Sequence, residues 1–99
     1  MSREWIVERI TGEFVCDDNG EKYYELEFKG FRKLKDRSWA NEKEVKRKLK
    51  EQLQGWEIKK KQFKERIEII ETTKEDEHGN SRKGKWIALR QARRLKKKN

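Results

Sequence analysis

The alternation of hydrophobic and polar residues predicts a β-hairpin at the start of the chain. Residues 5–10, Trp-Ile-Val-Glu-Arg-Ile, form an apolar and partly β-branched run that is typical of a strand. In residues 22–31, aromatic and aliphatic side chains alternate with charged ones, as in a strand with one buried face. Between these runs, residues 17–20 read Asp-Asp-Asn-Gly, and Asn-Gly favours a tight turn because it tolerates positive φ. We therefore predict a hairpin of residues 3–16 and 21–29.

A helix is predicted next, over residues 41–54. Ser38-Trp39 is interpreted as a short third strand, and Asn41 is a favourable N-cap residue. Gly55 is a natural stop after the last turn. Apolar residues recur every three to four positions and form a narrow stripe: Val45, Leu49, Leu53 and Trp56. We expect this stripe to pack against the sheet.

The pattern is less regular in the second half of the chain. Residues 56–58 can begin a strand, and residues 63–72 are predicted to form one. A turn at residues 77–80 precedes residues 85–89, which are predicted to return as the partner strand. The apolar spacing over residues 88–95 is helical.

These elements predict an α+β fold with a small antiparallel β-sheet packed by one helix. Hydrophobic residues make up only 31% of the 99 residues, so the core must be small. We place the sheet and helix in residues 1–55. Residues 56–99 are predicted to be a basic extension that forms a hairpin and a C-terminal helix. The alternative is a single ββαββ domain, in which the last hairpin joins the same sheet.

The chemistry available to the chain argues against catalysis. Its single cysteine, Cys16, excludes a disulfide framework and a cysteine-rich zinc site. Its single histidine, His78, lies in a turn-like stretch and is expected to be solvated. The glycines are scattered and form no phosphate-binding loop. We therefore expect a non-enzymatic protein with a free thiol and with no metal or cofactor.

Nothing in the chain predicts a membrane segment. No apolar run approaches the roughly 20 residues of a spanning helix. The first residues also lack the apolar stretch of a signal peptide. We expect an intracellular protein, nuclear if its source is eukaryotic, that has no membrane partner.

Three short motifs follow one another in the first half of the chain. Trp5 is followed by Val7-Glu8-Arg9-Ile10. The predicted second strand ends in Phe28-Lys29-Gly30-Phe31, and Ser38-Trp39 precedes the predicted helix. In their order and spacing these motifs resemble a chromodomain, and the resemblance covers about residues 4–54.

The resemblance implies a curved sheet and the recognition of a methylated histone tail. The methylated ammonium would be held by Trp5, Phe28 and Phe31, because aromatic faces attract a desolvated cation by about 2 kcal/mol. The peptide would add as a strand near residues 5–10. The chain departs from the family pattern at Ala40, where an acidic residue is usual, and in a slightly long preceding loop. The alternative is that these aromatic residues belong to the hydrophobic core. We also expect Trp39 to lie in the core.

The net charge of +9 is distributed unevenly along the chain. Residues 1–40 hold 8 Lys/Arg and 9 Asp/Glu, whereas residues 41–99 hold 20 Lys/Arg and 10 Asp/Glu. Residues 1–28 are the most acidic part, with 3 basic and 8 acidic residues. This asymmetry suits a cationic peptide at the hairpin and a polyanion at the second half.

Clusters of lysine and arginine predict contacts with the phosphates of DNA or RNA. The residues proposed for these contacts are Lys46, Arg47, Lys59, Lys60, Lys61, Arg82, Lys83, Lys85, Arg90, Arg93, Arg94, Lys96, Lys97 and Lys98. Trp86, beside one of the lysines, is a candidate for stacking on an exposed base. The alternative is a solvated, solubilising surface.

Three functions are compatible with these patterns. The first is a chromatin-associated module that recognises methyl-lysine and contacts nucleic acid through its basic half. The second is a viral, phage or mobile-element nucleic-acid-binding protein with the ββαββ fold. The third is a protein–protein interaction domain that binds its partner through the apolar helix stripe.

Overall fold

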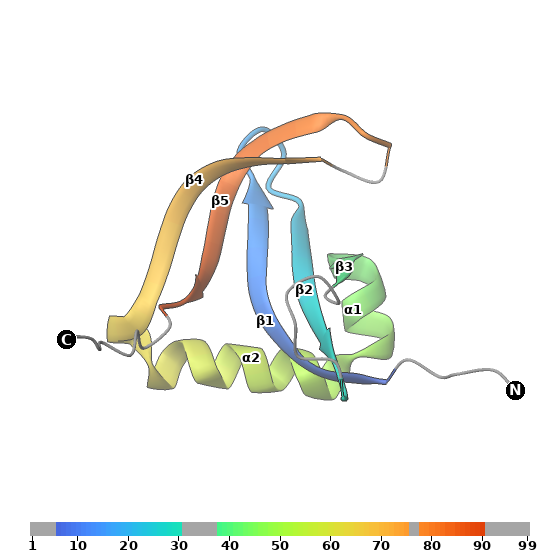
Figure 1. Ribbon diagram of the computed structural model, residues 1–99, viewed down its shortest axis with the longest axis vertical. Coiled ribbons are helices and arrows are strands. Elements are labelled where there is room, and N and C mark those ends of the chain that lie inside the picture. The colour runs from blue at the N-terminus through green and yellow to red at the C-terminus, as the bar shows by residue number, and fades with distance from the viewer. Residues whose placement is uncertain (1–5, 31–37, 76–77, 91–99) are drawn as a thin grey trace, which may run out of the picture.

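The computed structural model describes residues 6–30, 38–75 and 78–90. Within them the chain forms a five-stranded antiparallel sheet with strand order β3-β2-β1-β5-β4, together with two α-helices (Figure 1). The elements in chain order are β1 (Val7–Cys16), β2 (Lys22–Phe28), β3 (Ser38–Asn41), α1 (Glu42–Lys48), α2 (Lys50–Gln62), the 3-10 turn η2 (Lys64–Arg66), β4 (Ile67–Glu75) and β5 (Ser81–Leu89). The predicted α+β fold is confirmed.

The predicted N-terminal hairpin is confirmed, and β1 and β2 pair along most of their length. Gly20 closes the turn with a φ of 73°, and its backbone N–H donates to the carbonyl oxygen of Cys16 at 3.0 Å. Asn19 supports the turn because its Oδ1 accepts a hydrogen bond from the backbone N–H of Glu21 at 2.9 Å. The predicted turn therefore forms, with positive φ at Gly20 and not at Asn19.

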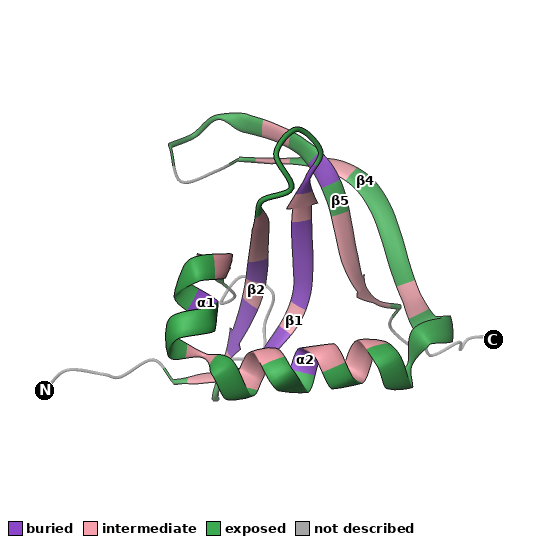
Figure 2. Ribbon diagram, turned by 180° about the vertical axis from the view of Figure 1, so that it is seen from behind, coloured by how far each residue is buried: buried purple, intermediate pink, exposed green. Residues whose placement is uncertain are grey.

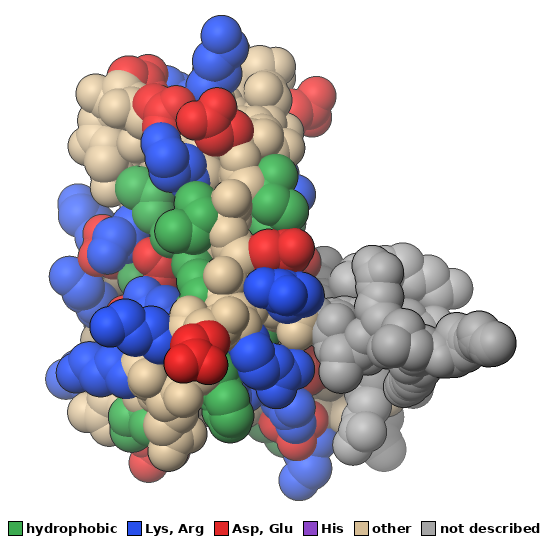
Figure 3. Space-filling view, turned by 90° about the vertical axis from the view of Figure 1, so that its left-hand side faces the viewer, with side chains coloured by type: hydrophobic (Ala, Val, Ile, Leu, Met, Phe, Trp, Pro, Cys, Tyr) green, Lys and Arg blue, Asp and Glu red, His purple; other side chains and the backbone are tan. Residues whose placement is uncertain are grey.

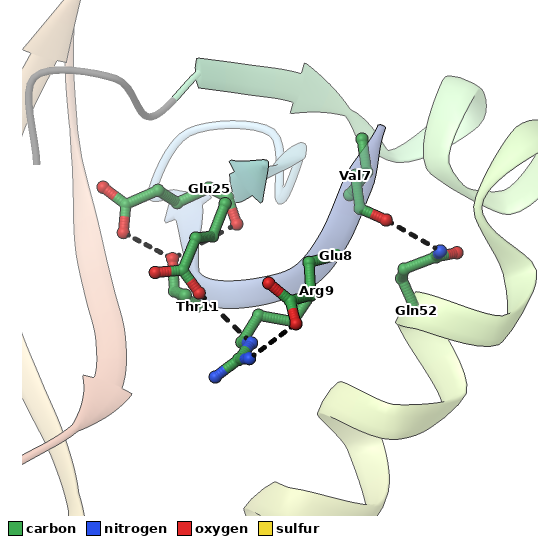
Figure 4. A network of polar contacts seen from close by, with 7 residues as sticks. Val7, Glu8, Arg9, Thr11, Glu25 and Gln52 are labelled. Carbon is green, nitrogen blue, oxygen red and sulfur yellow. Dashed lines mark hydrogen bonds and ion pairs between the residues drawn. The ribbon is translucent and has the colours of Figure 1, made fainter. Parts of the chain in front are cut away.

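Two register shifts in β1 change which side chains share a face. The second lies between Ile10 and Gly12, and the intervening Thr11 donates from its hydroxyl to Oε1 of Glu25 at 2.7 Å (Figure 4). Near the first, Arg9 forms an ion pair with Glu27 at 3.1 Å. Glu27 was expected on the exposed face of the second strand, but it is buried. Its ion pair explains how a carboxylate is accommodated there.

The predicted single helix is two helices. Asn41 caps α1 as expected, since its Oδ1 accepts a hydrogen bond from the backbone N–H of Glu44 at 2.9 Å. The chain leaves helical geometry at Leu49, with φ −127° and ψ 45°, and α2 begins at the next residue. This break allows α1 to pack against β2 and β3 while α2 packs against β1.

The predicted stop at Gly55 is wrong, because α2 continues through it to Gln62. Residues 56–58 are therefore helical and do not begin a strand. Gly55 does not adopt the positive φ of a helix-ending glycine. Its helical neighbours and the burial of Trp56 outweigh the roughly 1 kcal/mol that glycine costs in a helix.

The apolar helix stripe packs against the sheet, as predicted. Val45 and Trp56 are buried in one cluster with Ile10, Tyr24 and Leu26 from β1 and β2. The remaining two leucines of the stripe pack partly against that cluster. Figure 2 shows the buried residues concentrated on β1 and β2, whereas β4 is exposed along most of its length. The same burial removes the stripe as a surface for a partner protein.

The second half of the chain joins the sheet of the first half. β4 and β5 pair from Ile67↔Leu89 to Glu75↔Ser81, and β5 pairs with β1 from Glu13↔Ile87 to Cys16↔Gly84. The boundary predicted at residue 55 lies inside α2. The last hairpin belongs to the same sheet as the first, as in the ββαββ alternative. Ala88 and Leu89, which were predicted to begin a helix, end β5. Residues 91–95 of that predicted helix lie outside the described residues.

A buried carboxylate connects α2 to the sheet. The side chain of Glu13 is 2% exposed, and its Oε1 accepts hydrogen bonds from Nε1 of Trp56 and Nζ of Lys60, both at 2.7 Å. Lys60 also forms an ion pair with Glu57 at 3.3 Å. A buried charge is costly unless it is paired and hydrogen-bonded, so these contacts fix the position of α2 on β1.

This network shifts two pKa values upward. Burial alone lowers the pKa of Lys60, but the hydrogen bonds and charges of Glu13 and Glu57 outweigh burial and raise it. Burial, followed by the negative charge of Glu13, raises the pKa of Tyr24. Both groups therefore stabilise the fold below their unfolded pKa values of about 10, and this contribution is lost as the pH rises through the higher folded values.

We predict that Lys60→Met destabilises the fold at pH 8 by about 2–3 kcal/mol, because it leaves Glu13 buried without its cation. Lys61→Met is the matched control; Lys61 is exposed, and we expect a change within about 0.5 kcal/mol. Urea unfolding measures both. Equal stability of the two variants would contradict the proposed role of the ion pair.

In the wild-type protein the free energy of unfolding should fall as the pH rises above about 10.

Gly12 and Gly55 provide a second matched pair. A Cβ at Gly12 would overlap the indole ring of Trp86, whereas a Cβ at Gly55 meets no atom within 4 Å. We predict that Gly12→Ala destabilises by about 1–3 kcal/mol through overpacking. Gly55→Ala should stabilise by up to about 1 kcal/mol, because alanine is the better helix former. Thermal unfolding measures both, and a destabilising Gly55→Ala would show that the helix does not continue through this residue.

Candidate nucleic-acid interface and aromatic pocket

The aromatic cage implied by the chromodomain resemblance falls mostly outside the described residues. Trp5 and Phe31 are not among them, and Phe28 is half-buried and packs against the core cluster. The strand edge expected to receive a peptide is better defined. β5 pairs with β1 only from Glu13 onward, so Val7–Gly12 has no strand partner on that side within residues 6–30, 38–75 and 78–90.

Several of the cations predicted to contact phosphate are used inside the protein. Lys60 is bound to Glu13, as described above. Arg82 lies 3.6 Å from Asp18, and Lys85 lies 3.5 Å from Asp17. These ion pairs connect β5 to the turn between β1 and β2. The acidic hairpin and the basic second half therefore partly neutralise each other, and some of the charge asymmetry of the sequence is internal complementarity.

Other predicted cations have no ion-pair partner in another element of the described chain. Lys46, which is exposed, pairs with Glu42 one turn away in the same helix at 3.2 Å. In the part of the chain that the structure describes, the residues of the predicted set outside any ion pair are Arg47, Lys59, Lys61, Lys83 and Arg90. The predicted contacts that lie outside the described residues are Arg93, Arg94, Lys96, Lys97 and Lys98.

Two separate basic segments meet where the β4–β5 hairpin opens. The backbone N–H of Arg90 donates to the carbonyl oxygen of Arg66 at 2.7 Å, and Nη2 of Arg66 donates to the carbonyl oxygen of Arg90 at 3.2 Å. These bonds bring the end of β5 to the junction of α2 and β4. We call the resulting cluster the basic end; its members are Lys59, Lys61, Lys64, Arg66 and Arg90.

The sequence analysis did not identify Lys64 and Arg66 as site residues. They stand apart from the lysine triplet and were assigned to a strand, although they belong to a 3-10 turn. Glu65 is the one acidic residue within residues 59–66. The lysines of the last turn of α2 also have a structural role, because cations stabilise the negative end of the helix dipole.

Hydrophobic side chains are exposed on the same side of the molecule. Figure 3 shows a column of hydrophobic side chains with lysine and arginine side chains on both flanks. Next to the basic end, Phe63 is 39% exposed and Arg66 lies over its ring at 5.7 Å from the centroid. This side therefore offers both cations and apolar contact area.

A pocket of about 380 Å³ lies away from the basic end. The residues that line it are Phe14, Tyr23, Ser38, Trp39, Ala40, Asn41, Glu44, Lys74, Glu75 and Arg82. Trp39 was expected in the core, but it is 38% exposed on β3. Trp86, which was the predicted stacking residue, is half-buried and packs edge-on against Trp39, with ring centroids 5.3 Å apart. The exposed partner of this pair is therefore Trp39.

The thiol of Cys16 is free and buried, and burial raises its pKa. It is therefore an unreactive core group at neutral pH. Residues 6–30, 38–75 and 78–90 hold no cluster of three or more His, Cys, Asp or Glu side chains that could bind a metal ion. Among the helices in those ranges, none has the length and apolar character needed to cross a membrane.

Comparison with known proteins identifies no relative of this chain. No family model, no curated protein and no solved structure matches it. The resemblance to chromodomains therefore stays a prediction.

Proposed function

We propose that this chain is a non-enzymatic nucleic-acid-binding protein whose basic end contacts the phosphate backbone. The observation that carries the proposal is that five cations lie in the last turn of α2, in η2 and just after β5, where Arg66 and Arg90 exchange hydrogen bonds. None of the five takes part in an ion pair within the described part of the chain. Their charge is thus available to an external anion.

Such a cluster binds nucleic acid by neutralising phosphates and releasing the counterions condensed on them. Lysines on a helix end and arginines on a turn have no fixed orientation toward base edges, so sequence preference is not expected. The basic residues after Arg90 continue from this cluster along the chain: Arg93, Arg94, Lys96, Lys97 and Lys98. They would extend the contact along the backbone.

We predict that replacing three residues of the basic end, as Lys59→Gln, Lys61→Gln and Lys64→Gln together, weakens binding. The slope of log K against log salt should become shallower by about 3 for duplex DNA, at about 0.9 per lost phosphate contact. Fluorescence anisotropy with a labelled duplex at several salt concentrations measures this slope.

The control is the triple variant Lys22→Gln, Lys29→Gln and Lys43→Gln, which has the same net charge but alters other elements. Its slope should stay close to that of the wild-type protein. If both variants lose affinity equally, the contact is spread over the whole surface and the basic end is not the site. A flat salt dependence of the wild-type protein would reject nucleic-acid binding through phosphates.

A second candidate function is the recognition of a methylated histone tail, which would make the protein chromatin-associated. The observation in its favour is the unpaired edge of β1 at Val7–Gly12, where a peptide can add as a strand. Gln52 already donates from its Nε2 to the carbonyl oxygen of Val7 at 3.2 Å, so the backbone at this edge is within reach of α2.

If this function holds, a trimethyl-lysine histone peptide should bind more than about tenfold tighter than its unmodified form, because a cation–π contact contributes about 2 kcal/mol. Trp5→Ala should remove the difference without unfolding the protein. Calorimetric titration of the two peptides measures it. Equal affinity of the two peptides, or no binding, excludes methyl-lysine recognition and leaves the nucleic-acid proposal unaffected.

A further inference from the structure

The aromatic pocket opens on the face of the sheet opposite α2. Successive residues of a strand point to opposite faces, and Glu13 points toward α2, so Phe14 points away from it. The β4–β5 hairpin arches over this face toward β3 and α1 (Figure 1). The pocket is therefore bounded by the sheet on one side and by the outer half of the hairpin on the other.

The exposed wall of the pocket is an aromatic ring held in place from behind. Trp39 packs against Trp86 in an edge-to-face arrangement with an interplanar angle of 63°. Trp86 in turn lies over Gly12, where no side chain is present to displace it. A partly exposed indole with such support is a preorganised surface for stacking.

Cations lie next to this ring. Nζ of Lys74 is 5.1 Å from the centroid of Trp39 and 5.5 Å from that of Trp86. The register of the hairpin places Arg82 opposite Lys74, and both line the pocket. Glu44 and Glu75 line it as well, so the pocket has no formal excess charge. This composition favours a neutral aromatic group inside, with a phosphate at the rim, over a free anion.

We propose that this pocket takes one unpaired base of a single-stranded nucleic acid, stacked on Trp39, with the adjacent phosphate near Lys74. This inference rests on the proposed function, to which it adds a preference for single strands. Stacking on an aromatic side chain is open to any base, and a duplex hides its bases from such a contact. The long, flexible side chain of Lys74 can move from the indole to the phosphate.

The pocket and the basic end can be reached by one strand. Arg66 and Lys74 are eight residues apart along extended chain, which spans about 26 Å. A strand of about 15 nucleotides exceeds this distance even at a rise of about 3.4 Å per nucleotide. The base in the pocket and phosphates at the basic end can therefore belong to the same molecule.

The test compares a 15-nucleotide thymidine strand with an abasic strand of the same length, which keeps the phosphates and lacks the bases. Wild-type protein should bind the thymidine strand about tenfold tighter. Trp39→Leu should reduce this ratio to about one and leave the abasic affinity unchanged, whereas Trp39→Phe should retain part of it. Ile69→Ala is the control, because Ile69 is an exposed hydrophobic residue that does not line the pocket, and its ratio should stay at the wild-type value.

A second measurement needs no folded variant. The indole N–H signal of Trp39 in the NMR spectrum of the wild-type protein should shift with the thymidine strand and stay in place with the abasic strand. Salt-dependent binding of both strands with equal affinity, or with no shift of this signal, overturns the pocket assignment alone. A shift of equal size with thymidine monophosphate at the same concentration also overturns it, in favour of a free nucleotide. Absence of binding to either strand, while the duplex still binds, overturns this inference alone, and absence of binding to the duplex as well overturns the proposed function.

Discussion

The position of α2 depends on the buried carboxylate of Glu13. Its hydrogen bonds to Trp56 and Lys60 tie two successive turns of the helix to the central strand of the sheet. These two points lie one turn apart in the part of α2 after Gly55, and the second turns Lys60 inward. The neighbouring lysines, 59 and 61, then lie on either side of that contact. The buried ion pair in the core therefore helps to position the lysines of the basic end, whereas Arg66 and Arg90 are held by hydrogen bonds to each other.

The central strand β1 carries both functional halves of the molecule. One of its faces meets the helices and forms the core, whereas the other contributes Phe14 to the aromatic pocket. Both edges are paired, with β2 on one side and part of β5 on the other. Two register shifts, between Val7 and Arg9 and between Ile10 and Gly12, let this one strand satisfy these different neighbours, with a locally irregular ladder as the result.

The charge of the protein divides into an internal and an external part. The acidic turn between β1 and β2 holds Arg82 and Lys85, which fastens the last hairpin to the first. Exposed ion pairs of this kind contribute little energy each, but they fix orientation. Some of the cations outside ion pairs in the described part of the chain belong to the basic end, where Arg66 and Arg90 exchange hydrogen bonds. A polyanion would therefore contact the unpaired cations, and the total net charge overstates the charge available to it.

Local patterns in the sequence determined the first hairpin with its Asn-Gly turn, the cap at Asn41 and the buried helix stripe, because each depends on residues only a few positions apart. Only the tertiary structure decided that α2 passes Gly55 and that Trp39 stays partly exposed. It also decided which lysines are consumed by internal carboxylates and that the second hairpin joins β1. These outcomes depend on partners 40 or more residues away in the chain, and the energies of such pairs come from burial that no local pattern records.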